Sequence, residues 1–497
     1  MSPVADGAAL SDGQSSLSAL QLRAAVDAFA ALLRERGTRV LATLMDNSPA
    51  WVVADLAAAQ AGVVHVPLPV FFTPAQTGHA LRAAGVDTVL AARAALQAWP
   101  GITPVACSLA GQSLFLLALP AQPVPMPEGT AKITFTSGTT GTPKGVCLSQ
   151  PAMQQVAAGI RQALQPLGIE RHLCVLPLAV LLENIAGVLA PLSHGAQCVI
   201  PPLADVGLTG SSGFDPARFH AAVQSHQPHS LILLPQMLRA WSGWLAQTGQ
   251  RAPACLRMVA VGGAAVGARL VAGARSVGIP AYEGYGLSEG ASVQTMNLPG
   301  ADRPGTAGRP LPHARVRVSA AGEIEVAGSL FAGYLGDPAG HAAPAQWWPT
   351  GDLGRIDADG FLHVLGRSRN VLITSFGRNV SPEWVESALR DGPGIAQAVV
   401  LGDAQPALSA VLWPADPALP DTALQAAVDA ANAGLPDYAR VGRWVRSVVP
   451  FSAATGLATA NGRPQRAAVL AMYAHALGLA GNTPHEPVDN GVNHEFS

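Results

Sequence analysis

A stretch between Thr134 and Val146, TFTSGTTGTPKGV, gathers hydroxyl side chains and glycines around one lysine. Glycines let the backbone approach a ligand closely, and consecutive backbone N–H groups form a concave surface that binds anions. Lys144 adds a compact positive charge. These residue types at this spacing predict a loop that holds a phosphate chain. The residues that supply this chemistry are Thr136, Ser137, Gly138, Thr139, Thr140, Gly141, Thr142, Lys144 and Gly145.

Two other interpretations of this loop are less favoured. A surface linker rich in Gly and Thr seldom follows a buried strand, and the preceding run KITFTS is strand-like. A Walker-type loop, GxxxxGK[ST], does not fit, because Pro143 stands where its second glycine would be and Gly145 where its hydroxyl would be. Lys132 and Lys144 are the only lysines among 30 basic residues. The loop therefore keeps a lysine in a chain that otherwise uses arginine.

Strand-like and helix-like segments alternate around this loop. Residues 18–37 have apolar residues at helical spacing, and residues 48–62 form a second predicted helix with Ser48 as its cap and Pro49 in its first turn. Short apolar runs such as RVLATLM and VVHVPLP read as buried strands. This alternation predicts stacked α/β layers with much parallel pairing. After about residue 305, alternating segments with glycine turns predict antiparallel hairpins.

Composition narrows the class of protein. A chain of 497 residues with 49% hydrophobic and 12% charged residues predicts a folded protein of two or more domains. The net charge of −2 gives no reason to expect nucleic acid or an anionic membrane as partner. The first residues have no basic region followed by an apolar one, so no signal peptide is expected. The apolar stretch 173–192 is interrupted by Pro177, Glu183 and Asn184, which favours a buried helix over a transmembrane segment. The scattered cysteines, without a CxxC pair or Cys/His cluster, predict a reducing compartment and no zinc site. We therefore expect a cytoplasmic protein.

Several motifs, in order along the chain, resemble the adenylate-forming superfamily, which includes acyl- and aryl-CoA synthetases, peptide-synthetase adenylation domains and luciferases. FTSGTTGTPKGV is similar to its phosphate loop. The other matching segments are DNSPAWVVADLAAAQAGVVHVPLPV (46–70), VAVGGAAV (259–266), YEGYGLSEGAS (282–292), WWPTGDLGRIDADGFLHVLGRSRN (347–370) and GRNVSPEWVESAL (377–389). The resemblance implies an α/β fold: a large multi-layer N-terminal domain (1–368) with parallel-rich sheets and a small β-barrel-like part, then a small mobile α/β C-terminal domain (369–480). The polar tail 481–497 is predicted to be disordered.

The resemblance also implies a role for each matching residue. Glu289 would bind Mg²⁺, since a hard cation prefers oxygen ligands, and Asp352 would accept hydrogen bonds from the ribose hydroxyls. As alternatives, Glu289 is a solvated loop acid and the Thr-Gly-Asp motif at Asp352 is a plain hairpin turn. The residues expected to contact ATP are Thr136, Ser137, Gly138, Thr139, Thr140, Gly141, Gly262, Gly263, Ala264, Tyr285, Gly286, Ser288, Asp352 and Arg367. Lys144, Glu289 and Arg463 are the expected catalytic residues.

The implied reaction has two steps. A carboxylic acid attacks the α-phosphate of ATP to give acyl-AMP and pyrophosphate, and a thiol, usually coenzyme A, then displaces AMP. Between the steps the C-terminal domain would rotate at Arg369, and Gly377 would line the thiol tunnel. Two alternatives stay open: transfer to the pantetheine of an acyl carrier protein, and a nucleotide-binding protein with weak adenylation.

Two departures from the family pattern bear on these alternatives. Arg463, in ANGRPQRAAV, stands where the family has its adenylation lysine. Arginine keeps the charge but is larger, planar and forked, so retained function and an impaired first step are both open. In LPLAVLLENIAG, Val180 replaces a histidine typical of long-chain acyl-CoA synthetases, while Glu183 remains. Val180 would line an acyl pocket or belong to the core. The Leu-Pro-Leu-Ala segment and TSFGRNVSP favour the fatty acyl-CoA synthetase branch, with a fatty or aryl acid as substrate.

Overall fold

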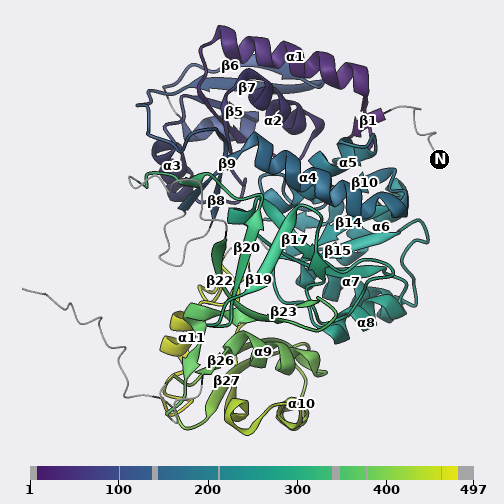
Figure 1. Ribbon diagram of the computed structural model, residues 1–497, viewed down its shortest axis with the longest axis vertical. Coiled ribbons are helices and arrows are strands. Elements are labelled where there is room, and N and C mark those ends of the chain that lie inside the picture. Colours follow the sequence, from purple (N-terminus) through teal and green to yellow (C-terminus); the bar gives the residue numbers. More distant parts are fainter. Residues whose placement is uncertain are drawn as a thin grey trace, which may run out of the picture. The chain divides into compact units, whose positions relative to one another are not determined.

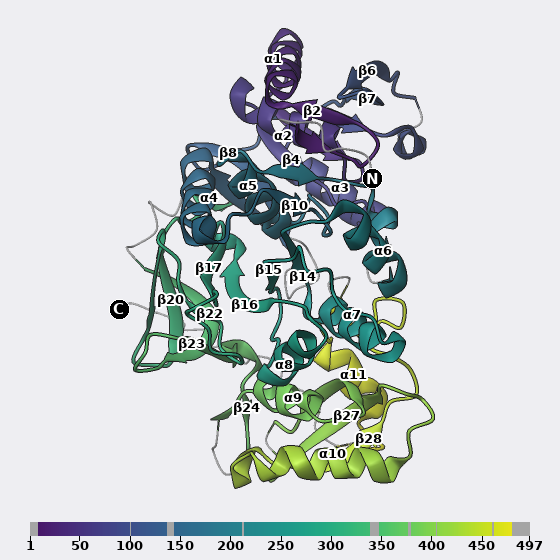
Figure 2. The same ribbon diagram turned by 90° about the vertical axis from the view of Figure 1, so that its right-hand side faces the viewer.

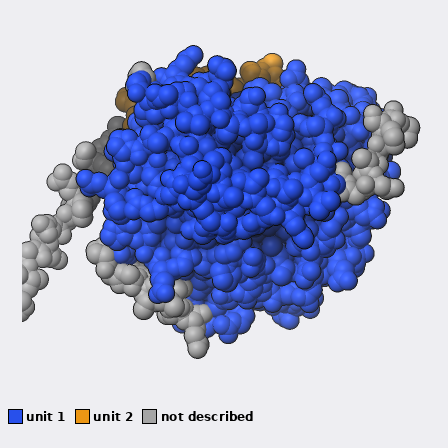
Figure 3. Space-filling view, turned by 90° about the horizontal axis from the view of Figure 1, so that it is seen from above, with its two compact units in different colours: residues 1–370 blue, residues 371–497 orange. Residues whose placement is uncertain are grey.

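Two large sheets and a smaller antiparallel sheet form the framework of the first of two units in the computed structural model. The units are residues 1–370 and residues 371–497 (Figure 3). The structure describes residues 8–99, 101–136, 144–210, 213–337, 347–375, 379–403, 405–459 and 462–479. The polar tail 481–497 lies outside the described residues.

The first large sheet has eight strands, in the order β21–β9–β8–β4–β3–β5–β7–β6. The strands are β3 (Val40–Leu44), β4 (Val64–Pro67), β5 (Thr88–Ala91), β6 (Val105–Leu109), β7 (Gln112–Ala118), β8 (Thr130–Thr136), β9 (Lys144–Ser149) and β21 (Gly333–Tyr334). Strands β8, β4, β3 and β5 pair in parallel, as the strand–helix alternation predicts. β9 and β7 extend this group by antiparallel pairing.

The second large sheet has nine strands, in the order β18–β17–β16–β15–β14–β10–β11–β1–β2. The strands are β1 (Ala8–Ser11), β2 (Ser16–Ser18), β10 (Arg171–Leu173), β11 (Gln197–Val199), β14 (Ser230–Leu233), β15 (Met258–Val261), β16 (Ala281–Leu287), β17 (Ser292–Met296) and β18 (Arg309–Pro310). The run from β11 through β10, β14 and β15 to β16 is parallel. β16 then turns back into antiparallel β17.

Helices cover and separate these sheets (Figures 1 and 2). In unit 1 they are α1 (Ala19–Glu35), α2 (Pro49–Ala61), α3 (Pro74–Ala83), α4 (Gln150–Leu164), α5 (Ala190–Leu192), α6 (Pro216–His226), α7 (Pro235–Thr248) and α8 (Ala268–Ser276), with a π-helix, η3, at Glu183–Leu189. Helix α4 lies between the two large sheets: Met153 and Ile160 share one buried cluster with Val146 of β9 and Met296 of β17. Helix α2 begins as predicted, because the Ser48 side chain accepts the Trp51 N–H at 3.3 Å and Pro49 occupies the first turn.

The segment 173–192, predicted to be one buried helix, is more complex. Its first residue closes strand β10, and η3 begins only at Glu183. The residues between them carry Pro177, which lacks the N–H that a helix interior needs. Among the residues that the structure describes, no helix is long and apolar enough to cross a membrane.

The predicted hairpins after residue 305 form a four-stranded antiparallel sheet, the barrel-like part of unit 1. Its order is β19 (Ala314–Val318), β20 (Glu323–Gly328), β22 (Trp348–Ile356) and β23 (Leu362–Arg367). Ile324, Val326 and Leu362 form its small core. The short 3₁₀ turns η5 (Ser288–Gly290) and η6 (Ser368–Asn370) follow strands β16 and β23.

Unit 2 is a smaller α/β unit built on three strands. These are β26 (Ile395–Leu401), β27 (Leu408–Pro414) and β28 (Val441–Arg446), with a hairpin of β24 (Leu372–Ile373) and β25 (Asn379–Val380) and helices α9 (Pro382–Asp391), α10 (Asp421–Ala433) and α11 (Arg466–Tyr473). Neighbouring residues of β26 face opposite sides: Val400 packs with α9 and α10, and Val399 packs with α11.

Candidate active site

The predicted phosphate loop joins two strands of an antiparallel hairpin. β8 ends at Thr136, β9 begins at Lys144, and these two residues face each other in the register of the pair. Lys144 is exposed and Thr136 is half-buried. The hairpin thus presents one hydroxyl and one ammonium at the start of the loop. The loop residues themselves, Ser137, Gly138, Thr139, Thr140, Gly141 and Thr142, lie outside the described residues.

A tyrosine connects this hairpin to Glu289. Strand β21 pairs with β9, so Tyr334 lies opposite Val146. The Tyr334 hydroxyl donates a 2.8 Å hydrogen bond to Glu289 Oε1, and Lys144 Nζ lies 5.7 Å from the centre of the Tyr334 ring. Burial, together with the neighbouring Glu289 carboxylate, raises the pKa of Tyr334 above its ordinary range, so the phenol stays protonated and donates. Sequence reasoning missed Tyr334, because a two-residue strand has no periodicity to read.

Glu289 has the chemistry that Mg²⁺ requires. It is a half-buried carboxylate held on one oxygen by Tyr334, and its backbone carbonyl accepts the Phe331 N–H at 2.8 Å. A carboxylate oxygen next to the phosphate hairpin is a suitable ligand for a hard cation. The hydrogen bonds also join the two large sheets, since Glu289 follows β16 and Tyr334 belongs to β21.

Asp352 is held between two side chains from different strands. The Tyr285 hydroxyl donates to its Oδ2 at 2.6 Å, and Arg367 Nε lies 2.7 Å from its Oδ1. Asp352 and Arg367 face each other on β22 and β23, and Asp352 is 5% exposed. Burial, and after it the Asp352 charge, raises the pKa of Tyr285 well above its ordinary value. A carboxylate is a hydrogen-bond acceptor, which is the group that ribose hydroxyls require as a partner.

Glycines shape the end of β15, where adenine is predicted to lie. Gly263 has φ of 84°, a left-handed conformation that favours glycine, and is exposed like Ala264. A Cβ on Gly262 would lie 3.3 Å from the carbonyl oxygen of Gly284 on β16. Gly286 and Ser288 follow on the same stretch of chain as Tyr285. Small residues therefore line the ends of β15 and β16. They lie next to Tyr285, Asp352 and Arg367, which we call the Asp352 cluster.

Of the four remaining predicted residues, the structure describes three. Arg463 belongs to unit 2, where it is exposed in a turn closed by the Thr459 N–H donating to its carbonyl at 2.8 Å. Arg369 is exposed in η6, and Gly377 lies outside the described residues. Val180 is half-buried, with its N–H bonded to the Pro177 carbonyl. The hinge, thiol-tunnel and acyl-pocket roles stay predictions.

The other lysine of the chain has a buried environment. Lys132 Nζ lies 2.8 Å from Asp55 Oδ1, donates to the Asn184 side chain, and is 3% exposed. Asp55 also contacts His65 Nδ1 at 2.6 Å. Burial alone would raise the carboxyl pKa, but the Lys132 ammonium and His65 hold the pKa of Asp55 well below its usual range. Lys132 lies on β8 four residues before Thr136, so this network anchors the strand that leads into the phosphate loop.

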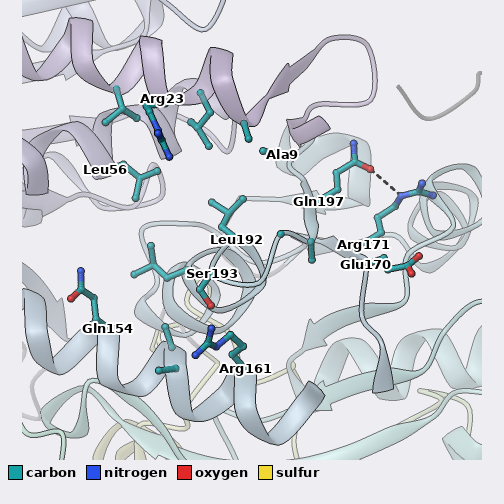
Figure 4. A pocket seen from close by; sticks show the side chains of 18 of the residues that line it. Ala9, Arg23, Leu56, Gln154, Arg161, Glu170, Arg171, Leu192, Ser193 and Gln197 are labelled. Carbon is teal, nitrogen blue, oxygen red and sulfur yellow. Dashed lines mark hydrogen bonds between the residues drawn. The ribbon is translucent and has the colours of Figure 1, made fainter. Parts of the chain in front are cut away.

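Two cavities of very different character lie in unit 1. A small one of about 50 Å³ lies between α4, η3 and the second sheet. Its walls are mostly apolar and include Ile160, Leu164, Ala186, Met258, Val293 and Met296. A larger groove of about 1040 Å³ opens between α1 and α4, where Figure 4 shows Arg23 and Arg161 on opposite walls. The described residues predicted to contact ATP are not among those lining the groove.

Known proteins resemble this chain in sequence and in fold. The AMP-binding enzyme family matches residues 3–335, and the AMP-binding enzyme C-terminal domain family matches residues 369–478. A long-chain-fatty-acid–CoA ligase of Mycobacterium bovis is 32% identical over 324 residues, 57% of this chain and 54% of the relative, so the chain spans about half the length of that relative. A feruloyl-CoA synthase of an Amycolatopsis species is 29% identical over 84% of this chain and 87% of its own length.

Solved structures confirm the predicted α/β fold. An anthranilate CoA ligase, crystallised with anthranoyl-AMP, superposes with a TM-score of 0.78 at 19% identity, over 95% of this chain and 96% of its own. The two family matches, to residues 3–335 and 369–478, together cover most of the chain. The chain belongs to the AMP-binding enzymes of the adenylate-forming superfamily.

Proposed function

We propose that this protein uses ATP to convert a carboxylic acid to an acyl-AMP and then transfers the acyl group to coenzyme A. The observation that carries the proposal is the meeting of two family motifs through Tyr334, which binds Glu289 at 2.8 Å and lies next to Lys144. The Asp352 cluster supports it, because a carboxylate held by Tyr285 and Arg367 suits ribose hydroxyls.

In the first step, Lys144, Glu289 and Asp352 each have a different task. A carboxylate oxygen of the acid attacks the α-phosphorus of ATP, and pyrophosphate leaves. Lys144 offsets the charge of the phosphate oxygens, and Glu289 would hold Mg²⁺, which neutralises further phosphate charge when bound. Asp352 fixes the ribose, so that the phosphate chain extends toward the hairpin. In the second step the thiol sulfur attacks the acyl carbonyl and AMP leaves.

The acid is proposed to have an apolar body. The relatives named above are a fatty-acid and a feruloyl enzyme, and the solved structure is of an anthranilate enzyme, so linear and aromatic acids both belong to the range. The cavity of about 50 Å³ lies against β15 and β17, strands that also neighbour the predicted nucleotide residues. Apolar walls are typical of sites for such acids, but ligand pockets have about 300 to 1,000 Å³, so this cavity would hold only part of such an acid.

The arginine at position 463, where the family has a lysine, is the observation in favour of one alternative, a nucleotide-binding protein with weak adenylation. Its turn precedes α11, which is anchored by Arg466: Arg466 lies 2.6 Å from Glu386 and 3.1 Å from Glu383 of α9. Arg463 is therefore presented from a well-supported segment, but as a forked guanidinium rather than a point charge. A second open alternative is an acyl carrier protein as the acceptor in place of coenzyme A.

Acid-dependent exchange of labelled pyrophosphate into ATP tests the first step. Full-length protein is assayed with straight-chain acids of graded length, ferulate and anthranilate, with Mg²⁺ present, and formation of the CoA thioester is followed separately. We expect exchange with at least one apolar acid and thioester formation from the same acid. ATP binding without exchange for any acid would contradict the synthetase proposal and support the weak-adenylation alternative.

The Arg463→Lys variant distinguishes the synthetase proposal from the weak-adenylation alternative. If Arg463 limits adenylation, the variant raises the exchange rate without changing the affinity for ATP. Equal rates in both proteins would show that arginine is sufficient at this position. Thioester formation with a carrier protein, but not with coenzyme A, would identify the other acceptor.

A further inference from the structure

A second cluster of reactive side chains lies inside unit 1, separate from the predicted nucleotide residues. His172 and Cys174 are two residues apart at the end of β10, and Glu183 is the first residue of η3. A ring nitrogen, the thiol sulfur and a carboxylate oxygen all lie within 4.8 Å of one another. His172 is 2% exposed, and Cys174 and Glu183 are fully buried. We call these three residues the donor cluster.

Hydrogen bonds from residues outside the donor cluster orient two of its members, His172 and Glu183. His172 Nδ1 lies 2.9 Å from the Ser230 hydroxyl, which leaves Nε2 directed at Glu183 Oε1, 3.1 Å away. Glu183 Oε2 accepts the Leu176 N–H at 3.2 Å. In metal sites, a histidine commonly donates its second nitrogen to a polar group that fixes the orientation of the ring, and ligating carboxylates are hydrogen-bonded in the same way.

Gly187 leaves the space in which the donor atoms meet. A Cβ at this position would lie 2.3 Å from Glu183 Oε1 and 2.8 Å from His172 Nε2, so a side chain would collide with both. The Gly187 carbonyl also lies 3.6 Å from the Cys174 sulfur and 3.5 Å from that of Cys198 on β11. A second buried thiol therefore borders the same glycine.

Charge gives the cluster a reason to bind a cation. An ionised carboxylate without exposure is costly unless a proton or a positive charge compensates it. A divalent cation bound by one carboxylate, one thiolate and a neutral imidazole is electrically balanced, as a dry core requires.

We propose that His172, Cys174 and Glu183 form a structural binding site for a zinc-type divalent cation. Nitrogen, sulfur and carboxylate oxygen are the ligands that Zn²⁺ takes, usually four of them in structural sites. The site joins the end of β10 to the π-helix η3. The sequence predicted no zinc site, because one His-x-Cys pair is not a zinc motif and Glu183 joins that pair only in the fold.

Cobalt spectroscopy on untagged full-length protein tests the site. The protein is dialysed against a chelator, titrated with Co²⁺ and then with Zn²⁺. We expect about one Co²⁺ per chain, a charge-transfer absorption that only a thiolate ligand produces, and its loss on addition of Zn²⁺. Binding at surface histidines would lack this absorption, and its absence in the parent protein would overturn the proposal.

Three variants locate the site. Cys174→Ser should weaken Co²⁺ binding at least about 100-fold and remove the absorption, and Ser230→Ala should weaken it about 10- to 100-fold by releasing the His172 ring. Cys147→Ser is the matched control, since Cys147 is equally buried but lies on β9 outside the cluster. Unchanged affinity in Cys174→Ser would refute the assignment. If that variant does not fold, the parent spectrum and Ser230→Ala decide.

Discussion

Lys132 and Asp55 form an ion pair in the core of unit 1, with 2.8 Å between Nζ and Oδ1 and side-chain exposures of 4% and 6%. Asn184 and His65 complete the hydrogen bonding of the pair. The ion pair joins α2 to β8, the strand that leads to the phosphate loop, and Asn184 adds η3 to the network. Of the two lysines in the chain, one is therefore structural and the other is at the predicted active site.

Lys132→Met should lower the free energy of unfolding by about 3 to 5 kcal/mol, because it leaves the Asp55 carboxylate buried without its cation. Methionine keeps most of the volume, so the loss reports the charge rather than a cavity. Urea unfolding followed by circular dichroism measures it. The double variant Lys132→Met/Asp55→Asn should recover part of the loss. A change below about 0.5 kcal/mol, typical of surface positions, would show that the pair does not support the fold.

Lys144→Ala, in contrast to Lys132→Met, should lower the activity and leave the stability nearly unchanged. Lys144 is exposed, and its removal should change the free energy of unfolding by less than about 0.5 kcal/mol. Acid-dependent pyrophosphate exchange should fall by about 10²-fold or more, since a charge that acts on the phosphates is lost. Urea unfolding measures the first effect, and the pyrophosphate exchange assay measures the second. Normal exchange in Lys144→Ala would remove the loop assignment.

Tyr334→Phe should disturb Mg²⁺-dependent ATP use. The variant keeps the ring near Lys144 but removes the hydrogen bond that orients Glu289. We expect kcat/KM for ATP to fall by about 10-fold, with a higher Mg²⁺ concentration needed for half-maximal rate. The assay is exchange activity against Mg²⁺ concentration. Tyr438→Phe, at an exposed tyrosine of unit 2, is the control. An unchanged Mg²⁺ requirement would argue against this role for Tyr334.

Glu283 should make stability depend on pH. Burial raises its pKa to about 7 from 4.5, although the backbone N–H groups of Gly305 and Gly267 act in the opposite direction. Below pH 4.5 the carboxyl is protonated in both folded and unfolded chains. As pH rises from 4.5 to 7, the unfolded chain loses the proton first, so the stability contributed by protonated Glu283 is lost.

Glu283→Gln removes this dependence. Relative to the parent, the variant should gain stability between pH 4.5 and 7 and keep the gain above pH 7, up to about 3 kcal/mol for a shift of this size. Unfolding midpoints in urea across this pH range measure the difference. Glu128→Gln, at an exposed position, should follow the parent at every pH. A parallel course of Glu283→Gln and parent would contradict the raised pKa.

Local signals in the sequence predicted local structure well. Ser48 caps α2 because the cap, the proline and the apolar run are adjacent in the chain. The alternation of strands and helices predicted parallel layers, and glycine-separated hairpins predicted the antiparallel sheet. The break in the segment 173–192 was missed, because an apolar run does not distinguish an irregular stretch with a turn after Pro177 from a helix.

Contacts between distant segments could not be read in this way. Tyr285 and Asp352 are 67 residues apart and belong to different sheets, so only the fold shows that their side chains meet. The family resemblance named both residues but not their hydrogen bond. Tyr334 and the Lys132 network escaped notice for the same reason. The catalytic and ATP-binding roles stay predictions, which the variants above test.

The burial of Lys132 has a practical consequence for solution studies. An amine-selective acylating reagent can reach the exposed Lys144 side chain in the folded protein, while Lys132 is shielded at 3% exposure and engaged by Asp55. Apart from the terminal amino group, labelling of the native chain therefore reports on a single position. Protection of that position by added nucleotide would provide a direct footprint of occupancy at the hairpin, and labelling of Lys132 would record unfolding of the core.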